Sequence, residues 1–81
     1  MSATAADIRY EVWRFIWDQL GYEPKDVLPD KKLSDYDMDE IDIIELVCCF
    51  EDEHGVSVDD KRIKPDMTVQ ELSDYLQSLV Q

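Results

Sequence analysis

The spacing of apolar residues predicts a first amphipathic helix near the start of the chain. From about Thr4 to Leu20, apolar side chains recur every three or four residues, as in a helix that buries one face. These side chains are Ile8, Val12, Phe15, Ile16 and Leu20. Gly21 follows them and predicts the end of the helix, because glycine readily adopts the left-handed conformation found after a last helical residue.

A second helix is predicted to start near Asp37 or Asp39 and to end at Gly55, since the run between holds neither glycine nor proline. It has apolar residues on two sides. The side expected to pack carries Ile43, Leu46, Val47 and Phe50. The opposite side carries Ile41, Ile44 and Cys48.

The loop between these helices holds Pro24 and Pro29 and is about fifteen residues long, which is unusual in a small domain unless the loop has turns of its own. We expect Val27, Leu28 and Leu33 to pin it to the core.

The last third of the chain predicts a short helical turn and a final helix. The turn is expected from Asp59 to Ile63, before Pro65. Thr68-Val69-Gln70-Glu71 has the form of a capping box and predicts a helix to about Leu79. Its inward residues should be Val69, Leu72, Tyr75, Leu76 and Leu79. The chain is therefore predicted to be a single all-α domain over residues 1–81, with three main helices and one short one.

Charge narrows the classes of partner. Twenty acidic residues against eight basic ones give 81 residues a formal net charge of −12, while a hydrophobic content of 44% is too high for a disordered acidic tail. Such a charge disfavours nucleic acid and anionic membranes, and it favours the basic surface of a protein partner. No segment has the length of a membrane span or the pattern of a signal peptide, so we expect a cytoplasmic monomer.

The acidic residues concentrate in one part of the chain. No lysine or arginine occurs from Leu33 to Asp60, and the apolar residues on the outer side of the second helix lie within this stretch. This combination predicts a docking surface for a partner with an apolar groove and a basic margin. The predicted partner-binding residues are Asp39, Ile41, Asp42, Ile44, Glu45, Cys48, Glu51, Asp52 and Asp60. Two alternatives remain: the carboxylates only keep the protein soluble, or the first loop covers the apolar residues.

Metal and catalytic sites are not predicted. Asp35-x-Asp37-x-Asp39 copies the first three ligand positions of an EF-hand, but Glu40 stands where its glycine is needed and Leu46 where its bidentate glutamate is needed.

The remaining chemistry-bearing residues give the same result. Cys48 and Cys49 are adjacent in a helix, so we expect free thiols, and His54 is the only histidine and does not complete a zinc site with them. No arrangement of nucleophile, base and acid points to an enzyme.

Several short motifs in one common register resemble those of bacterial fatty-acid acyl carrier proteins. They are Gln19-Leu20-Gly21, Asp39-Glu40-Ile41, Ile44-Glu45-Leu46-Val47, Glu51-Asp52-Glu53 and Thr68-Val69-Gln70. The resemblance implies a right-handed four-helix bundle with a long first loop. It also implies that Asp39-Glu40-Ile41 stands where the family has Asp-Ser-Leu, whose serine carries a 4′-phosphopantetheine arm.

Departures from the family pattern change the functional expectation. Glu40 replaces the serine, His54 stands where the family usually has an aromatic core residue, and Lys64 replaces an acid. A carboxylate cannot accept the arm, so no phosphopantetheine is expected. The leading hypothesis is an interaction module without a prosthetic group that docks on a carrier-dependent enzyme, such as one of fatty acid or polyketide biosynthesis.

Three other hypotheses stay open. The chain could be a true carrier modified at Ser34, six residues before Glu40, or an acidic mimic that occupies a basic groove, or a degenerate copy without a specific partner. Glu40 itself has two interpretations: it forms a capping box with Asp37 as N-cap, or it keeps a negative charge where a phosphate would stand.

Overall fold

The computed structural model describes residues 4–80, which form three α-helices and three short 3₁₀ turns. The α-helices are α1 (Ala5–Leu20), α2 (Glu40–His54) and α3 (Val69–Val80). The turns are η1 (Pro24–Asp26), η2 (Leu33–Tyr36) and η3 (Asp60–Arg62). Within the described residues there is no strand beyond one isolated bridge between Lys32 and Thr68, so the predicted all-α fold is confirmed.

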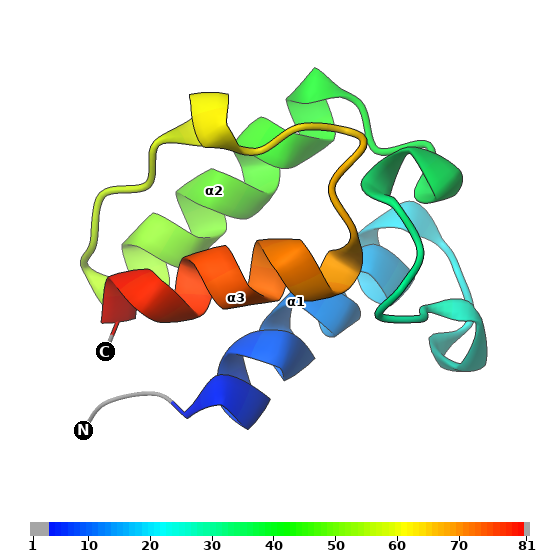
Figure 1. Ribbon diagram of the computed structural model, residues 1–81, viewed down its shortest axis with the longest axis horizontal. Helices are drawn as coiled ribbons and strands as arrows, with labels where there is room; N and C mark the ends of the chain where they lie inside the picture. Colours follow the sequence, from blue (N-terminus) through cyan, green and yellow to red (C-terminus); the bar gives the residue numbers. More distant parts are fainter. Residues whose placement is uncertain (1–3, 81) are drawn as a thin grey trace.

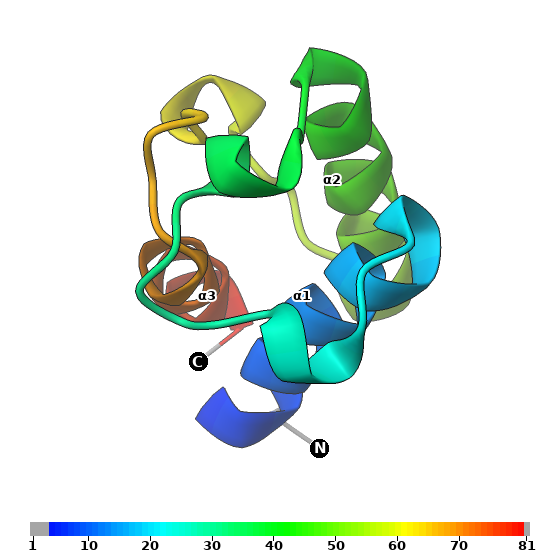
Figure 2. The same cartoon turned by 90° about the vertical axis from the view of Figure 1, so that its right-hand side faces the viewer.

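The three helices enclose the core, and the long first loop closes one end of the bundle (Figures 1 and 2). The most extensive contact between helices joins α1 to α3. The predicted short helix is present as the single turn η3, and the first loop has turns of its own, η1 and η2. None of the helices described over residues 4–80 is both long enough and apolar enough to cross a bilayer.

Both glycines end helices as predicted. Gly21 follows α1 with a φ of 81°, and Gly55 follows α2 with a φ of 64°. At the other end of α1, Thr4 is the N-cap and forms a capping box with Asp7. These caps fix both ends of α1 and the C-terminal end of α2.

The core uses the predicted inner faces of the helices. The predicted residues that are buried are Ile8, Val12, Ile16, Ile43, Leu46, Val47, Phe50, Val69, Leu72 and Leu76. The predicted residues at the edge of the core, only partly buried, are Phe15, Leu20, Tyr75 and Leu79. The first loop adds two buried residues that were not expected there, Tyr36 and Met38.

The first loop is held partly as predicted. Val27 and Leu33 are buried, but the prediction for Leu28 is wrong, because its side chain is 42% exposed. The buried Tyr36 replaces it as an anchor: its hydroxyl accepts a hydrogen bond from the Leu28 N–H at 2.7 Å and donates one to the Asp26 carbonyl at 2.8 Å. The loop is therefore held at Leu28 by its backbone rather than by its side chain.

Backbone hydrogen bonds also tie this loop to the start of α3. The Leu33 N–H donates to the Met67 carbonyl at 2.8 Å, and the Val69 N–H donates to the Lys31 carbonyl at 2.9 Å. These bonds make the loop an ordered part of the fold and position the segment that leads into α2.

The start of α2 differs from the predicted capping box. Asp39 is the N-cap, and its carboxylate accepts from the Asp42 N–H at 2.9 Å, while the Asp42 carboxylate accepts from the Asp39 N–H at 3.2 Å. Asp37 instead ends η2 in the left-handed conformation, with a φ of 55°. An N-cap needs an extended backbone, so Asp37 cannot cap α2, and the predicted pair of Asp37 with Glu40 is wrong.

Replacement of Asp39 by alanine should lower the free energy of unfolding by about 1 kcal/mol, because α2 loses its N-cap. Glu40→Ala removes the same charge one residue later and should have a clearly smaller effect. Urea unfolding of both variants measures the difference. Equal losses of stability would contradict this assignment of the cap.

Candidate functional site

The outer side of α2 presents an apolar stripe to solvent, defined by Ile41, Ile44 and Cys48. Ile41 is 66% exposed and Ile44 is 43% exposed, and Cys48 is exposed as well. The first loop therefore does not cover the stripe, and that alternative is wrong. Exposed isoleucines one turn apart on a helix form a surface that a partner can bury.

The carboxylates around the stripe fall into two groups. Asp39 and Asp42 form the cap of α2, and the partly buried Glu51 carboxylate accepts from the Val58 N–H at 2.8 Å. These three side chains stabilise the fold through hydrogen bonds to the backbone. Glu45 and Asp52 are exposed, and their carboxylates make no hydrogen bond or ion pair with any residue from 4 to 80.

Glu40 is the first residue of α2 and is exposed beside a groove between α2 and η3. The groove has a volume of about 460 Å³. Its lining is Glu40, Ile43, Ile44, Asp60, Lys61, Ile63, Lys64 and Pro65. The structure thus brings Asp60 to the same groove as Glu40 and Ile44.

Sequence reasoning did not place two lysines in this groove. Lys61 and Lys64 follow directly on the acidic stretch that ends at Asp60, and only the return of the chain along α2 brings them near Glu40. The signal in the sequence was the abrupt change of sign after Asp60.

Ser34 lies in η2, the 3₁₀ turn that precedes α2 in the chain. It is exposed, and its N–H donates to the Pro65 carbonyl at 2.9 Å. It is therefore accessible but belongs to a different element from Glu40.

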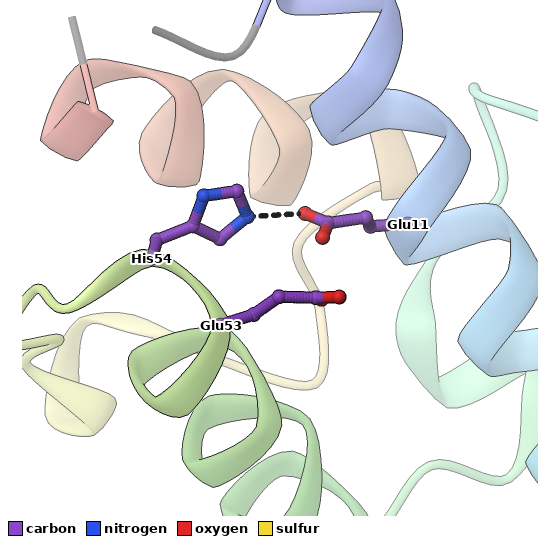
Figure 3. Close-up of side chains that lie close together, drawn as sticks. All are labelled: Glu11, Glu53 and His54. Atoms are coloured by element: carbon purple, nitrogen blue, oxygen red, sulfur yellow. Dashed lines mark hydrogen bonds and ion pairs between the residues drawn. The ribbon is translucent and has the colours of Figure 1, made fainter. Parts of the chain in front are cut away.

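A second group of chemistry-bearing side chains joins α1 to the end of α2 (Figure 3). The His54 Nε2 lies 2.7 Å from the Glu11 Oε2, and Glu53 points toward the same space. The His54 ring also packs on Phe50, with ring centroids 4.4 Å apart. His54 therefore keeps an aromatic contact with the core and adds a polar link to α1. Sequence reasoning missed this link because 43 residues separate its two partners.

The environment of Glu11 alters its titration. Burial raises the pKa of the Glu11 carboxyl above its ordinary value of 4.5, and the nearby Glu53 carboxyl raises it further. His54 acts in the opposite direction without cancelling the rise in pKa. Glu11 thus holds its proton more tightly in the folded chain than in the unfolded one.

This shift makes Glu11→Gln a pH-sensitive substitution. Folding raises the pKa of Glu11. The folded protein therefore loses stability as the pH rises from 4.5 through the higher pKa that Glu11 has in the folded state. The Gln variant lacks this loss, so its stability relative to the wild type should increase as the pH rises from about 4.5 through the higher pKa of the folded state. Thermal unfolding of both proteins across this range is the measurement. A difference that stays constant or falls would contradict the direction of the shift.

Cys48 and Cys49 are free thiols, as predicted, and both are exposed. The side chain of Cys48 belongs to the apolar stripe, whereas Cys49 faces the groove between α1 and α2.

Known proteins match this chain over most of its length. Residues 15–76 match the family described as the phosphopantetheine attachment site. The acyl carrier protein of Thermosynechococcus vestitus is 30% identical over 76 residues, which cover 93% of this chain and 94% of that protein. Members of this family are carriers and not catalysts, in agreement with the prediction that the chain is not an enzyme. With its three-helix architecture, its long ordered first loop and these matches, the chain belongs to the acyl carrier protein family.

Proposed function

We propose that this chain is a carrier-like interaction module that docks on the basic surface of a protein partner and carries no phosphopantetheine. The observation that carries the proposal is the exposed apolar stripe of α2, which begins directly after an exposed glutamate at the first position of the helix. On this proposal the chain keeps the surface by which a partner recognises it and lacks the acceptor of the arm.

The chemistry of position 40 does not fit the prosthetic group of the family. Attachment of phosphopantetheine needs a nucleophilic hydroxyl that forms a phosphodiester, and the Glu40 carboxylate offers none. The Glu40 side chain makes no hydrogen bond within the described residues, and the cap of α2 does not depend on it. Its negative charge at the start of a helix is favourable, as that of a phosphate would be.

The docking surface that we propose is smaller than the set predicted from the sequence. Ile41 and Ile44 supply the apolar contact, and Glu45, Asp52 and Asp60 supply carboxylates without a structural task. Cys48 extends the apolar stripe. Asp39, Asp42 and Glu51 contribute negative potential but are committed to bonds within the fold.

The partner that fits this surface is a protein with a basic margin around an apolar contact, and we propose a carrier-dependent biosynthetic enzyme. The charge of −12 favours rapid association with such a surface and disfavours nucleic acid.

Incubation with a phosphopantetheinyl transferase and coenzyme A tests the missing attachment. Intact mass spectrometry should show no change for the wild-type chain. A gain of roughly 340 Da, the mass of one phosphopantetheine arm, would overturn the proposal, since it requires a nucleophile elsewhere. Loss of that gain in Ser34→Ala would then identify the chain as a true carrier modified at Ser34.

A further inference from the structure

The Glu11/Glu53/His54 cluster brings three side chains of the types that can ligate metals, from two helices, to one place (Figure 3). One ligand atom from each residue lies within 4.8 Å of the other two. Glu11 comes from the middle of α1, and Glu53 and His54 are the last two residues of α2. The cluster therefore depends on the tertiary fold and is not a simple run of acids along one helix.

The charges of this region favour a cation. Two carboxylates meet at the C-terminal end of α2, where the helix dipole adds partial negative charge. Apart from His54, no basic side chain among residues 4–80 forms an ion pair with Glu11 or Glu53. Arg14 lines the same groove without pairing with either glutamate.

From this geometry we propose that the Glu11/Glu53/His54 cluster binds one divalent transition-metal ion, with Zn²⁺ as the best match. His54 Nε2 and one carboxylate oxygen from each glutamate would be its protein ligands. The proposal departs from the sequence-based expectation of no metal site, which rested on the cysteines and the EF-hand pattern.

The distances suit an ion of this size. Ligands about 2.0–2.2 Å from a tetrahedral Zn²⁺ lie roughly 3.3 Å from one another. The His54 Nε2 and Glu11 Oε2 atoms, now 2.7 Å apart, would separate by about 0.6 Å as the ion replaces their hydrogen bond. Glu53 is exposed, so its flexible side chain can close the remaining distance.

The ligand set argues for a transition metal rather than Ca²⁺ or Mg²⁺. The two alkaline-earth ions prefer six or more oxygen ligands, whereas imidazole suits Zn²⁺ and its neighbours. Glu11 and Glu53 also line a groove of about 500 Å³ between α1 and α2, so water can reach a fourth coordination position. A bound ion would link α1 to α2 and stabilise the fold, because the unfolded chain does not hold these residues together.

Zn²⁺ titration of the metal-free protein tests the site. The Cys48→Ser/Cys49→Ser background is used throughout, since exposed thiols would bind zinc on their own. Calorimetry should show one Zn²⁺ per chain, with weaker binding of Ca²⁺ and Mg²⁺, and the melting temperature should rise with Zn²⁺. His54 is the only histidine, so NMR of its imidazole nitrogens should report coordination without ambiguity.

Three variants separate a specific site from general attraction to an acidic protein. Glu53→Gln and His54→Phe should each weaken Zn²⁺ binding at least about tenfold, because each removes one ligand. Phenylalanine keeps the ring on Phe50, and Glu53 is exposed, so at least one variant should fold. Asp52→Asn, which removes an exposed carboxylate next to Glu53, should bind Zn²⁺ like the background protein.

Two results would overturn the proposal. One is equal Zn²⁺ affinity in Glu53→Gln, in His54→Phe and in the background protein. The other is an imidazole spectrum that does not change at saturating Zn²⁺. Either result would leave Glu11 and His54 as a hydrogen-bonded pair that only joins the two helices.

Discussion

Glu40→Ser should convert the chain into a substrate of a phosphopantetheinyl transferase. The substitution places a hydroxyl at the exposed first residue of α2, between Asp39 and Ile41 and beside the groove that η3 borders. Since Asp39 and not Glu40 caps the helix, serine at this position should leave the fold intact. We expect a gain of roughly 340 Da in Glu40→Ser and none in Glu40→Ala, because only serine supplies the nucleophile.

The outcome of this experiment separates recognition from chemistry. Modification of Glu40→Ser would mean that the surface around α2 still docks the transferase and that only the acceptor is missing. An unmodified but folded Glu40→Ser protein would contradict the proposal that the docking surface is retained. Circular dichroism of each variant provides the check on folding.

Reversal of two exposed charges on α2 should produce the second large effect. The wild-type chain, which lacks the acceptor, should inhibit transfer of phosphopantetheine to the acyl carrier protein of Thermosynechococcus vestitus by competing for the transferase. Glu45→Lys/Asp52→Lys should raise the inhibition constant about tenfold or more, because it places positive charge against a basic surface. The side chains of both residues make no hydrogen bond or ion pair within the described residues, so the stability of the protein should change little.

A matched control removes the effect of net charge alone. Asp30→Lys/Asp66→Lys makes the same change of charge at two exposed loop positions outside α2. It should inhibit almost as well as the wild type. Equal weakening by both double variants would show general electrostatic attraction instead of docking through α2, and no inhibition by the wild type would count against docking on this enzyme.

The helices could be predicted because their signals in the sequence are local. The apolar spacing of residues 8–20 and 43–50 and the two glycines after α1 and α2 gave the inner faces and both helix ends. The capping box at Thr68 is also present, with Glu71 accepting from the Thr68 N–H at 3.0 Å. Each of these features involves residues within one or two helical turns, so no knowledge of the tertiary fold was needed.

The errors arose where residues outside the predicted helix decide the outcome. Asp37 and Asp39 are both plausible caps in sequence, and only the end of η2 assigns the role to Asp39. Leu28 is more hydrophobic than Tyr36, but the tyrosine hydroxyl can bond two backbone groups while its ring is buried. The Glu11 and His54 pair could not be predicted from spacing, because the packing of α1 beside the end of α2 creates it.

The proposed docking surface also has one feature that could be predicted locally and one that depends on the rest of the fold. Its position on α2 could be predicted from the helical period. Its exposure to solvent could not, because the long first loop could equally have covered Ile41 and Ile44. The structure also showed that Glu51 holds the backbone at Val58 instead of facing a partner freely.

The central claim is that this member of the acyl carrier protein family works without a covalent arm. The most direct measurement is the intact mass of the chain purified from the cells that produce it naturally, at neutral pH and without added thiols, so that no thioester is cleaved. We predict a single species at the mass of the unmodified polypeptide. A species heavier by roughly 340 Da or more, equal to phosphopantetheine with or without an acyl group, would contradict the account. It would show that a nucleophile other than Glu40 carries the arm.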